Sequence, residues 1–226
     1  MSDVFIPIHQ FEIRYTPILD FDMGSKKIVS PFIKLVNSFQ IEQENTHRQR
    51  ISLKFNEDFD TIGIWWDRIF IKTIATNSNF TESPSSFTSL FQPIFEKLKE
   101  LDSFGNIHTI IFHTIAVKPY VGEINDIIND FKSEYFTDKI DDFCKDAQDY
   151  GVVIESQKNE KHITCNLGPY VGVEDLIKRN IGTLTDDKYN QRGRMITVTI
   201  TATKEDITHK YYKELNELAN SYIEKL

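Results

Sequence analysis

The sequence contains little cysteine and no long apolar segment, and both absences narrow the class of protein. Only Cys144 and Cys165 occur in the 226 residues, which argues against a disulfide framework and excludes a metal site built from cysteines alone. A transmembrane helix needs about 18 or more consecutive apolar residues, and no such run is present. The first residues also lack the basic and then apolar stretches of a secretion signal. We therefore expect a cytoplasmic protein.

The common catalytic motifs are also missing. The 9 glycines form neither a phosphate-binding loop nor a dinucleotide fingerprint, and there is no Gly-x-Ser-x-Gly elbow. His108 and His113 stand five residues apart in a predicted strand, so their side chains leave on opposite faces and do not converge on one ion. We expect no metal, no cofactor and no enzymatic activity. An enzyme of unfamiliar type remains an alternative, because dispersed Asp, Tyr and Arg residues leave no local motif.

Positive charge is scarce relative to negative charge. The 34 acidic residues outnumber the 26 basic ones, which gives a formal net charge of -8. Such a balance disfavours attraction to a phosphate backbone, although a local basic patch could overcome it. Nucleic acid is therefore not the expected partner.

Apolar and aromatic residues, in contrast, are plentiful and evenly spread. They make up 40% and 12% of the chain, and no Pro-, Gly- or Ser-rich linker interrupts them. This composition supports a sizeable core. We expect one domain over residues 1–226, with 1–119 and 120–226 as candidate subdomains.

Alternation of apolar and polar residues predicts most of the strands, and apolar residues at helical spacing predict the helices. The last helix has Thr203 as its expected cap, with Asp206 three residues later. Pro93 either kinks a second helix or marks its first turn. Strands are predicted at 9–18, 50–55, 61–75, 106–117, 151–156, 161–167 and 194–204, and helices at 31–39, 83–101, 123–150 and 203–222.

Strands that follow one another, with helices gathered between groups of strands, indicate the α+β class. We predict a largely antiparallel sheet with amphipathic helices packed on one face and a C-terminal helix. The two halves share a rough order of hairpin, further strand and helix, so a distant internal duplication is one interpretation.

One tetrapeptide occurs twice. Pro-Tyr-Val-Gly stands at 119–122 and again at 169–172, each time between an apolar, strand-like run and an acidic, helix-like one. Proline and glycine suit a turn at the end of a strand. A local turn function, a coincidence or relic of duplication, and a paired ligand site are the alternatives.

Two pairs of residues are the candidate binding residues. Arg192 and Arg194 flank Gly193 just before the most regular strand, and two guanidinium groups there could hold a phosphate, a carboxylate or an acidic partner surface. A polar loop with solvated arginines is the alternative. Trp65 and Trp66 are neighbours in a predicted strand, so one of them could lie on the outer surface and anchor an interface. Packing of both under helices is the other interpretation.

Several segments resemble a sporadically distributed family of uncharacterised bacterial proteins. They are the early strand "FEIRY", a mid-chain meander followed by a helix and a long strand, a hairpin that ends in "NLGPY", and a last strand leading into "ELNELANSYIE". The resemblance covers most of the chain. It implies no catalytic residues, and a gene that occurs irregularly among genomes, as parts of mobile or phage-defence cassettes do.

The leading hypothesis is a non-enzymatic cytoplasmic protein that acts through protein contacts, with a partner or with further copies of itself. It would serve as an adaptor, sensor or accessory subunit of a multi-component bacterial system, of which anti-phage defence is one example. The alternative is a small-molecule or nucleotide binder with a helix-grip-like cavity under the C-terminal helix. Arg192 and Arg194 would then lie at the mouth of that cavity.

Overall fold

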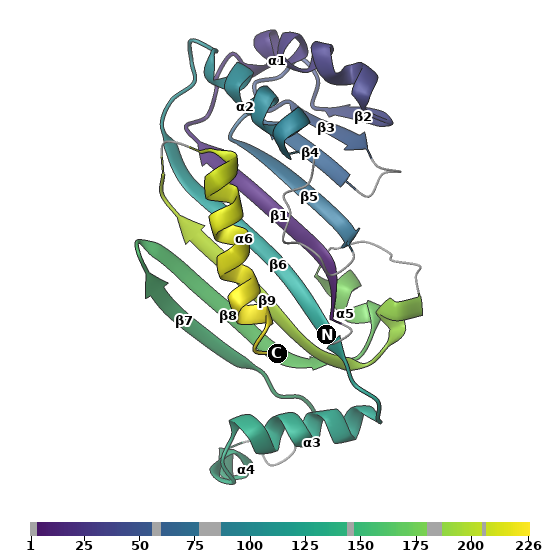
Figure 1. The fold of residues 1–226 in the computed structure, drawn as a ribbon. Helices are drawn as coiled ribbons and strands as arrows, with labels where there is room; N and C mark the ends of the chain where they lie inside the picture. The colour runs from purple at the N-terminus through teal and green to yellow at the C-terminus, as the bar shows by residue number, and fades with distance from the viewer. Residues whose placement is uncertain (1–3, 56–59, 77–86, 144–146, 180–186, 205–206) are drawn as a thin grey trace.

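A single antiparallel sheet organises the molecule. The computed structural model describes residues 4–55, 60–76, 87–143, 147–179, 187–204 and 207–226, and within them nine strands follow the spatial order β2-β3-β4-β5-β1-β6-β9-β8-β7 (Figure 1). Every pair of neighbouring strands is antiparallel. The strands are β1 (Phe5–Tyr15), β2 (Ser38–Glu42), β3 (Arg50–Phe55), β4 (Asp60–Trp65), β5 (Arg68–Thr76), β6 (Ile107–Pro119), β7 (Val152–Lys158), β8 (Lys161–Tyr170) and β9 (Gly193–Ala202).

Helices are inserted at corresponding points of the two halves of the chain. They lie between the first strand of each half and its meander, and again after its last strand, and the second half has a further helical insertion between β8 and β9. The class predicted from the sequence, α+β with a largely antiparallel sheet and a C-terminal helix, is confirmed. The helices are α1 (Phe21–Val29), α2 (Gln92–Lys99), α3 (Ile124–Tyr135), α4 (Lys139–Phe143), α5 (Val173–Lys178) and α6 (His209–Ile223), with the 3-10 segments η1 (Ser30–Leu35) and η3 (Asp187–Asn190) and the π-helical η2 (Phe87–Phe91).

The strand order has an internal symmetry. β1 and β6, the first strands of the two halves, pair at the centre of the sheet, and each pairs on its other side with the last strand of its own half. Outward from the centre, one half reads β1-β5-β4-β3-β2 and the other reads β6-β9-β8-β7. The first half has one strand more. This topology is what a distant duplication predicts, with the repeat beginning anew at β6.

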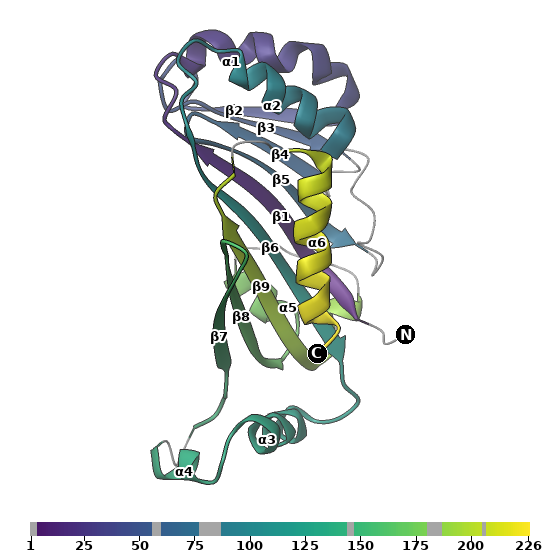
Figure 2. The ribbon, with the colours of Figure 1, turned by 60° about the vertical axis from the view of Figure 1, so that its left-hand side comes forward.

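The main core lies between the sheet and α1, α2 and α6, which cover the same face (Figures 1 and 2). Phe11 on β1 and Phe112 on β6 are Cα partners at the centre, and both are fully buried. Tyr212 of α6 packs edge-on against Phe11 at 5.4 Å between ring centroids, and Phe87 of η2 lies 4.4 Å from the same tyrosine. One aromatic cluster therefore joins residues from both halves, which are far apart in the sequence.

A smaller core lies on the opposite face, near one end of the sheet. Leu176 of α5 and Tyr189 of η3 pack there against Phe5, Val117 and Met195 of the central strands. β6 is consequently buried on both faces from Thr114 to Val117, while nearer its beginning only alternate residues are buried. The central strand predicted from the sequence is present, and its two-sided burial is restricted to the end that α5 and η3 cover.

Two local predictions were wrong. The segment 31–39 is not an α-helix, because Ser30–Leu35 form a 3-10 segment and Phe39 already belongs to the edge strand β2, where it is 53% exposed. The helix before it, α1, begins ten residues earlier at Phe21. The cap of α6 is Thr208, whose hydroxyl accepts the Tyr211 N–H, and not Thr203. The predictions for 83–86, Cys144 and Asp206 lie outside the described residues.

Candidate binding surface on the open sheet face

The face of the sheet opposite α1, α2 and α6 carries many polar side chains. We call the part of it that α5 and η3 do not cover the open face. Strand pairing places one polar residue of every strand side by side in a row across the whole sheet, and each of these residues is at least partly exposed. In spatial order the row is Ser38, Lys54, Thr61, Lys72, Gln10, His113, Thr199, Thr164 and Glu155.

Trp65 is the centre of an aromatic and basic cluster on the open face. The guanidinium groups of Arg50 and Arg68 lie 4.5 Å and 5.2 Å from its ring centroid, within the range of cation–π attraction. Phe70 meets it edge-on at 5.4 Å. A Cβ at position 63 would lie 2.2 Å from the Phe70 ring, so any larger residue would displace that ring. The lack of a side chain at Gly63 thus lets the Phe70 ring lie across β4.

A buried carboxylate on β1 accepts hydrogen bonds from several side chains of the open face. Glu12 on β1 is 5% exposed and accepts hydrogen bonds from Arg14 at 2.6 Å, Gln10 at 2.9 Å and Arg68 at 3.3 Å. Arg68 also makes two hydrogen bonds to Asp67. The charges of Arg14 and Arg68 are therefore balanced within the molecule, as buried or half-buried charges need to be.

Three other cations on the same face are not balanced in this way. Arg50, Lys54 and Lys72 form no ion pair with any of the described residues, although the chain as a whole is acidic. Burial lowers the pKa of Lys72, since it favours the neutral amine. The indole N–H of Trp65 and the Nε–H of Arg50 are buried and find no acceptor in the described part of the chain. Such unsatisfied donors are uncommon in folded proteins.

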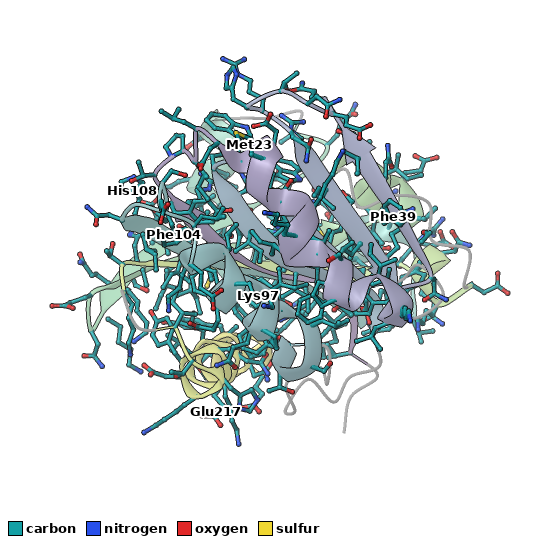
Figure 3. The ribbon with its side chains drawn as sticks, turned by 90° about the horizontal axis from the view of Figure 1, so that it is seen from above. Met23, Phe39, Lys97, Phe104, His108 and Glu217 are labelled. Atoms are coloured by element: carbon teal, nitrogen blue, oxygen red, sulfur yellow. The ribbon has the colours of Figure 1, made fainter. Side chains whose placement is uncertain are left out.

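His113 lies on the open face beside this group. Its Nδ1 is 3.0 Å from the Thr199 hydroxyl, and burial together with the nearby positive charges of Arg179 and Lys72 lowers its pKa to about 4. The ring is therefore neutral at physiological pH. His108 lies at the beginning of β6, with its Nε2 3.1 Å from the Thr16 hydroxyl, near Phe104 in Figure 3. His108 and His113 do not converge.

The two tryptophans proposed as interface residues differ in position. Trp65 is half-buried on the open face, as described above. Trp66 lies in the turn after β4 and packs against the edge of the main core, with Arg48 5.9 Å from its ring centroid and His47 6.4 Å away. Its carbonyl accepts the Ile18 N–H at 2.8 Å. Trp65 is thus the better placed of the two for contact with another molecule.

The two arginines singled out from the sequence hold α3. Arg192 pairs with Glu123 at the beginning of that helix, and Arg194 pairs with Glu134 near its end. Arg194 also lies 6.0 Å from the ring centroid of Phe131, which is buried. Their charges are therefore balanced within the molecule. The space under α6 is filled by Tyr212, Leu215 and neighbouring side chains of the main core.

The two Pro-Tyr-Val-Gly segments meet at one glycine. Pro119 at the end of β6 and Tyr170 at the end of β8 are both Cα partners of Gly193, from its two sides. A Cβ on Gly193 would lie 2.2 Å from the carbonyl oxygen of Lys118, so only glycine fits there. The segments are not equivalent in the repeat, because one follows the first strand of its half and the other the third. Both end a strand and lead into a helix, which favours local turn function over a relic of duplication.

A groove lies between the helices that follow these turns. It has a volume of about 810 Å³, and α3 lines one side with Ile124 and Ile128 while α5 lines the other with Asp175 and Lys178. Tyr150 closes part of it. The groove is open to solvent and mixes apolar, acidic and basic side chains.

Sequence reasoning missed the open-face cations. Alternation in 50–55 and 68–76 assigns Arg50, Lys54 and Lys72 to the polar side of their strands. It does not place them on one surface, because that depends on which strands pair and in which register.

Comparison with known proteins gives no assignment. No protein-family model matches the chain, and no curated protein sequence matches it significantly. None of the described helices is long and apolar enough to cross a membrane. Among the described residues, no group of three or more His, Cys, Asp or Glu side chains is arranged to hold a metal ion.

Proposed function

We propose that this protein is a non-enzymatic binding protein, an adaptor or accessory subunit, that receives a protein partner on its open face. One observation carries the proposal. Arg50, Lys54 and Lys72 are cations without an ion-pair partner among the described residues, on the sheet face that α1, α2 and α6 leave free, and Arg50 lies against the half-buried Trp65. Aromatic and arginine side chains of this kind are enriched at protein interfaces. The setting in mobile or phage-defence gene cassettes stays a prediction of the resemblance.

Site-specific photo-crosslinking tests this proposal. A photoreactive amino acid replaces Thr61, which lies between Lys54 and Lys72 in the polar row. A matched control replaces Glu217, which lies on the outer side of α6 (Figure 3). In extract of the native cells, we expect one protein to crosslink at residue 61 and not at residue 217. Light scattering of the purified pair then gives a complex of fixed stoichiometry. Equal crosslinking at both positions, or none at residue 61, would contradict the proposal.

The groove between α3 and α5 supports a second candidate, small-molecule binding. Its volume of about 810 Å³ is within the usual range for a ligand site. A thermal-shift screen with nucleotides and small acids tests it, since a ligand that binds only the folded state raises the melting temperature. Substitution of Ile128 by Trp fills the groove and should abolish any shift. A shift that survives this substitution would place the ligand elsewhere.

A further inference from the structure

We propose that the occupant of the open face is an acidic segment of the partner protein, whose carboxylates pair with Arg50, Lys54 and Lys72. This inference rests on the proposed function and adds the chemistry of the partner. The three cations share one surface but come from two strands, and the described residues offer them no carboxylate within ion-pairing distance. An acidic segment supplies the negative charge that the described residues do not place beside these cations.

The spacing of the cations suits an extended chain. Arg50 and Lys54 are four residues apart on β3, which corresponds to about 13 Å along a strand. Lys54 and Lys72 are separated by β4, which corresponds to about 10 Å across the sheet. Carboxylates four residues apart on an extended segment match the first distance. Phe70, half-buried beside Trp65, offers an apolar contact between the charged positions.

Burial shifts the pKa of Lys72, so this pKa should respond to a bound carboxylate. Its pKa is lowered because no carboxylate compensates the partial burial of its ammonium group. A partner carboxylate would stabilise the charged form and raise that pKa. Binding is therefore coupled to a measurable property of a single side chain.

The charge distribution favours a short acidic protein segment over a nucleic acid strand. The basic positions lie on β3 and β5, while the same row continues over β6, β9, β8 and β7 with His113, Thr199, Thr164 and Glu155. A longer polyanion would leave the basic positions and meet a molecule of net charge -8. Proteins that bind nucleic acid by its backbone usually carry an excess of basic residues over the whole binding face. A segment a few residues long avoids this repulsion.

Fluorescence anisotropy with a labelled octaglutamate peptide tests the inference at about 20 mM salt, where screening is weak. One variant combines Arg50→Gln, Lys54→Gln and Lys72→Gln. We expect each single substitution to weaken binding about threefold and the triple variant about tenfold or more. The pKa of Lys72, measured by NMR on its side chain, should rise in the complex.

A matched control variant combines Lys27→Gln, Lys34→Gln and Lys210→Gln, which are exposed on α1, η1 and α6. It removes the same amount of charge from the other side of the molecule, so its affinity should stay within about twofold. Equal losses in both variants, or no binding to the wild-type protein, would overturn the inference. Tighter binding of a short oligothymidine through the same three cations would also overturn it, in favour of nucleic acid.

The two proposals fail separately. If residue 61 crosslinks to a protein but octaglutamate does not bind, the acidic chemistry is wrong and the protein contact stands. If octaglutamate binds and no protein crosslinks at residue 61, the proposed function is wrong while the anion-binding surface stands. Circular dichroism of each variant checks that the fold is retained.

Discussion

At the scale of single residues, Gly193 is a position where a side chain would meet backbone. Its Cα lies against the Lys118 carbonyl between the two Pro-Tyr-Val-Gly segments, and an added Cβ would lie 2.2 Å from that oxygen. Backbone cannot move away as a flexible side chain can. The ends of β6 and β8, which precede α3 and α5, therefore require glycine at this position.

We predict that Gly193→Ala lowers the free energy of unfolding by about 2 kcal/mol or more, because β6 and β9 must separate locally to admit the methyl group. Denaturation with urea measures the change. Gly151→Ala is the control, since the nearest atom to its added Cβ is 3.5 Å away, an ordinary contact. A loss at Gly193 no larger than that at Gly151 would show that the strands accommodate a side chain.

Two buried histidines make stability depend on pH. His9 is buried against Tyr212, with 2.6 Å between its Nε2 and the tyrosine hydroxyl, and burial lowers its pKa to about 3. The pKa of His113 is lowered to about 4. Below pH 6.5 the unfolded chain binds protons at these residues while the folded protein does not. Stability is therefore lost as pH falls from 6.5, by at most about 1.4 kcal/mol per pH unit for each histidine.

We predict that His113→Gln removes about half of this histidine contribution between pH 6.5 and 5. Glutamine can still hydrogen-bond to Thr199 but does not titrate. Urea denaturation at several pH values measures the slope, and the window lies above the usual range of carboxyl groups. An unchanged slope in the variant would mean that His113 is accessible to protons in the folded protein.

At the scale of elements, α3 stands apart from the other helices. It lies beyond one end of the sheet and is not part of either apolar core (Figures 1 and 2). Its attachment consists of the buried residues Ile127 and Phe131, the ion pairs of Arg192 and Arg194, and the hydrogen bond from Tyr120 to Asp130 at 2.6 Å. In the first half, α1 instead packs beside α2 over the sheet.

We predict that Phe131→Ala loosens α3 without unfolding the sheet. Hydrogen exchange of the amides in α3 should become about 100-fold faster, because a large buried ring is lost, while exchange in β6 and β9 is unchanged. Arg194→Gln, which removes a partly exposed ion pair, should have a much smaller effect. Phe95→Ala in the main core is the control for global destabilisation. If Phe131→Ala speeds exchange throughout the sheet, α3 is an integral part of the core.

At the scale of the whole molecule, the two halves share one core. β1 and β6 are paired over most of their lengths, and the aromatic cluster around Tyr212 includes residues from both halves. A half on its own would expose this face to water. The topological repeat therefore does not imply two independent folding units.

We predict that both halves unfold in one transition. Trp65 and Trp66 report on the first half by fluorescence, and the buried thiol of Cys165 on β8 reports on the second half by its reaction with a labelling agent. Cys144→Ser leaves Cys165 as the only thiol. The two urea midpoints should coincide. Separate midpoints would show that the β1–β6 pairing is the weak point of the sheet.

The sequence by itself determined the class and most of the strands. Alternation of side chains is a local property. The sequence therefore predicted which residues of β3, β5, β8 and β9 face the core and which face the polar side. Edges were harder. β2 was missed because Phe32, Leu35 and Phe39 fit a helical spacing, although Ser30–Leu35 form only a 3-10 segment and Leu35 and Phe39 stay exposed.

Only the tertiary structure decided what the polar faces do. Register between strands is set by long-range packing, and it places Trp65 of β4 and Lys72 of β5 on the same surface as Arg50 and Lys54 of β3. The packing of α3 against one end of the sheet pairs Arg192 with Glu123 and Arg194 with Glu134, so both arginines form ion pairs within the molecule. Charge is a local property of the chain, but whether a charge is balanced depends on residues that only folding brings near.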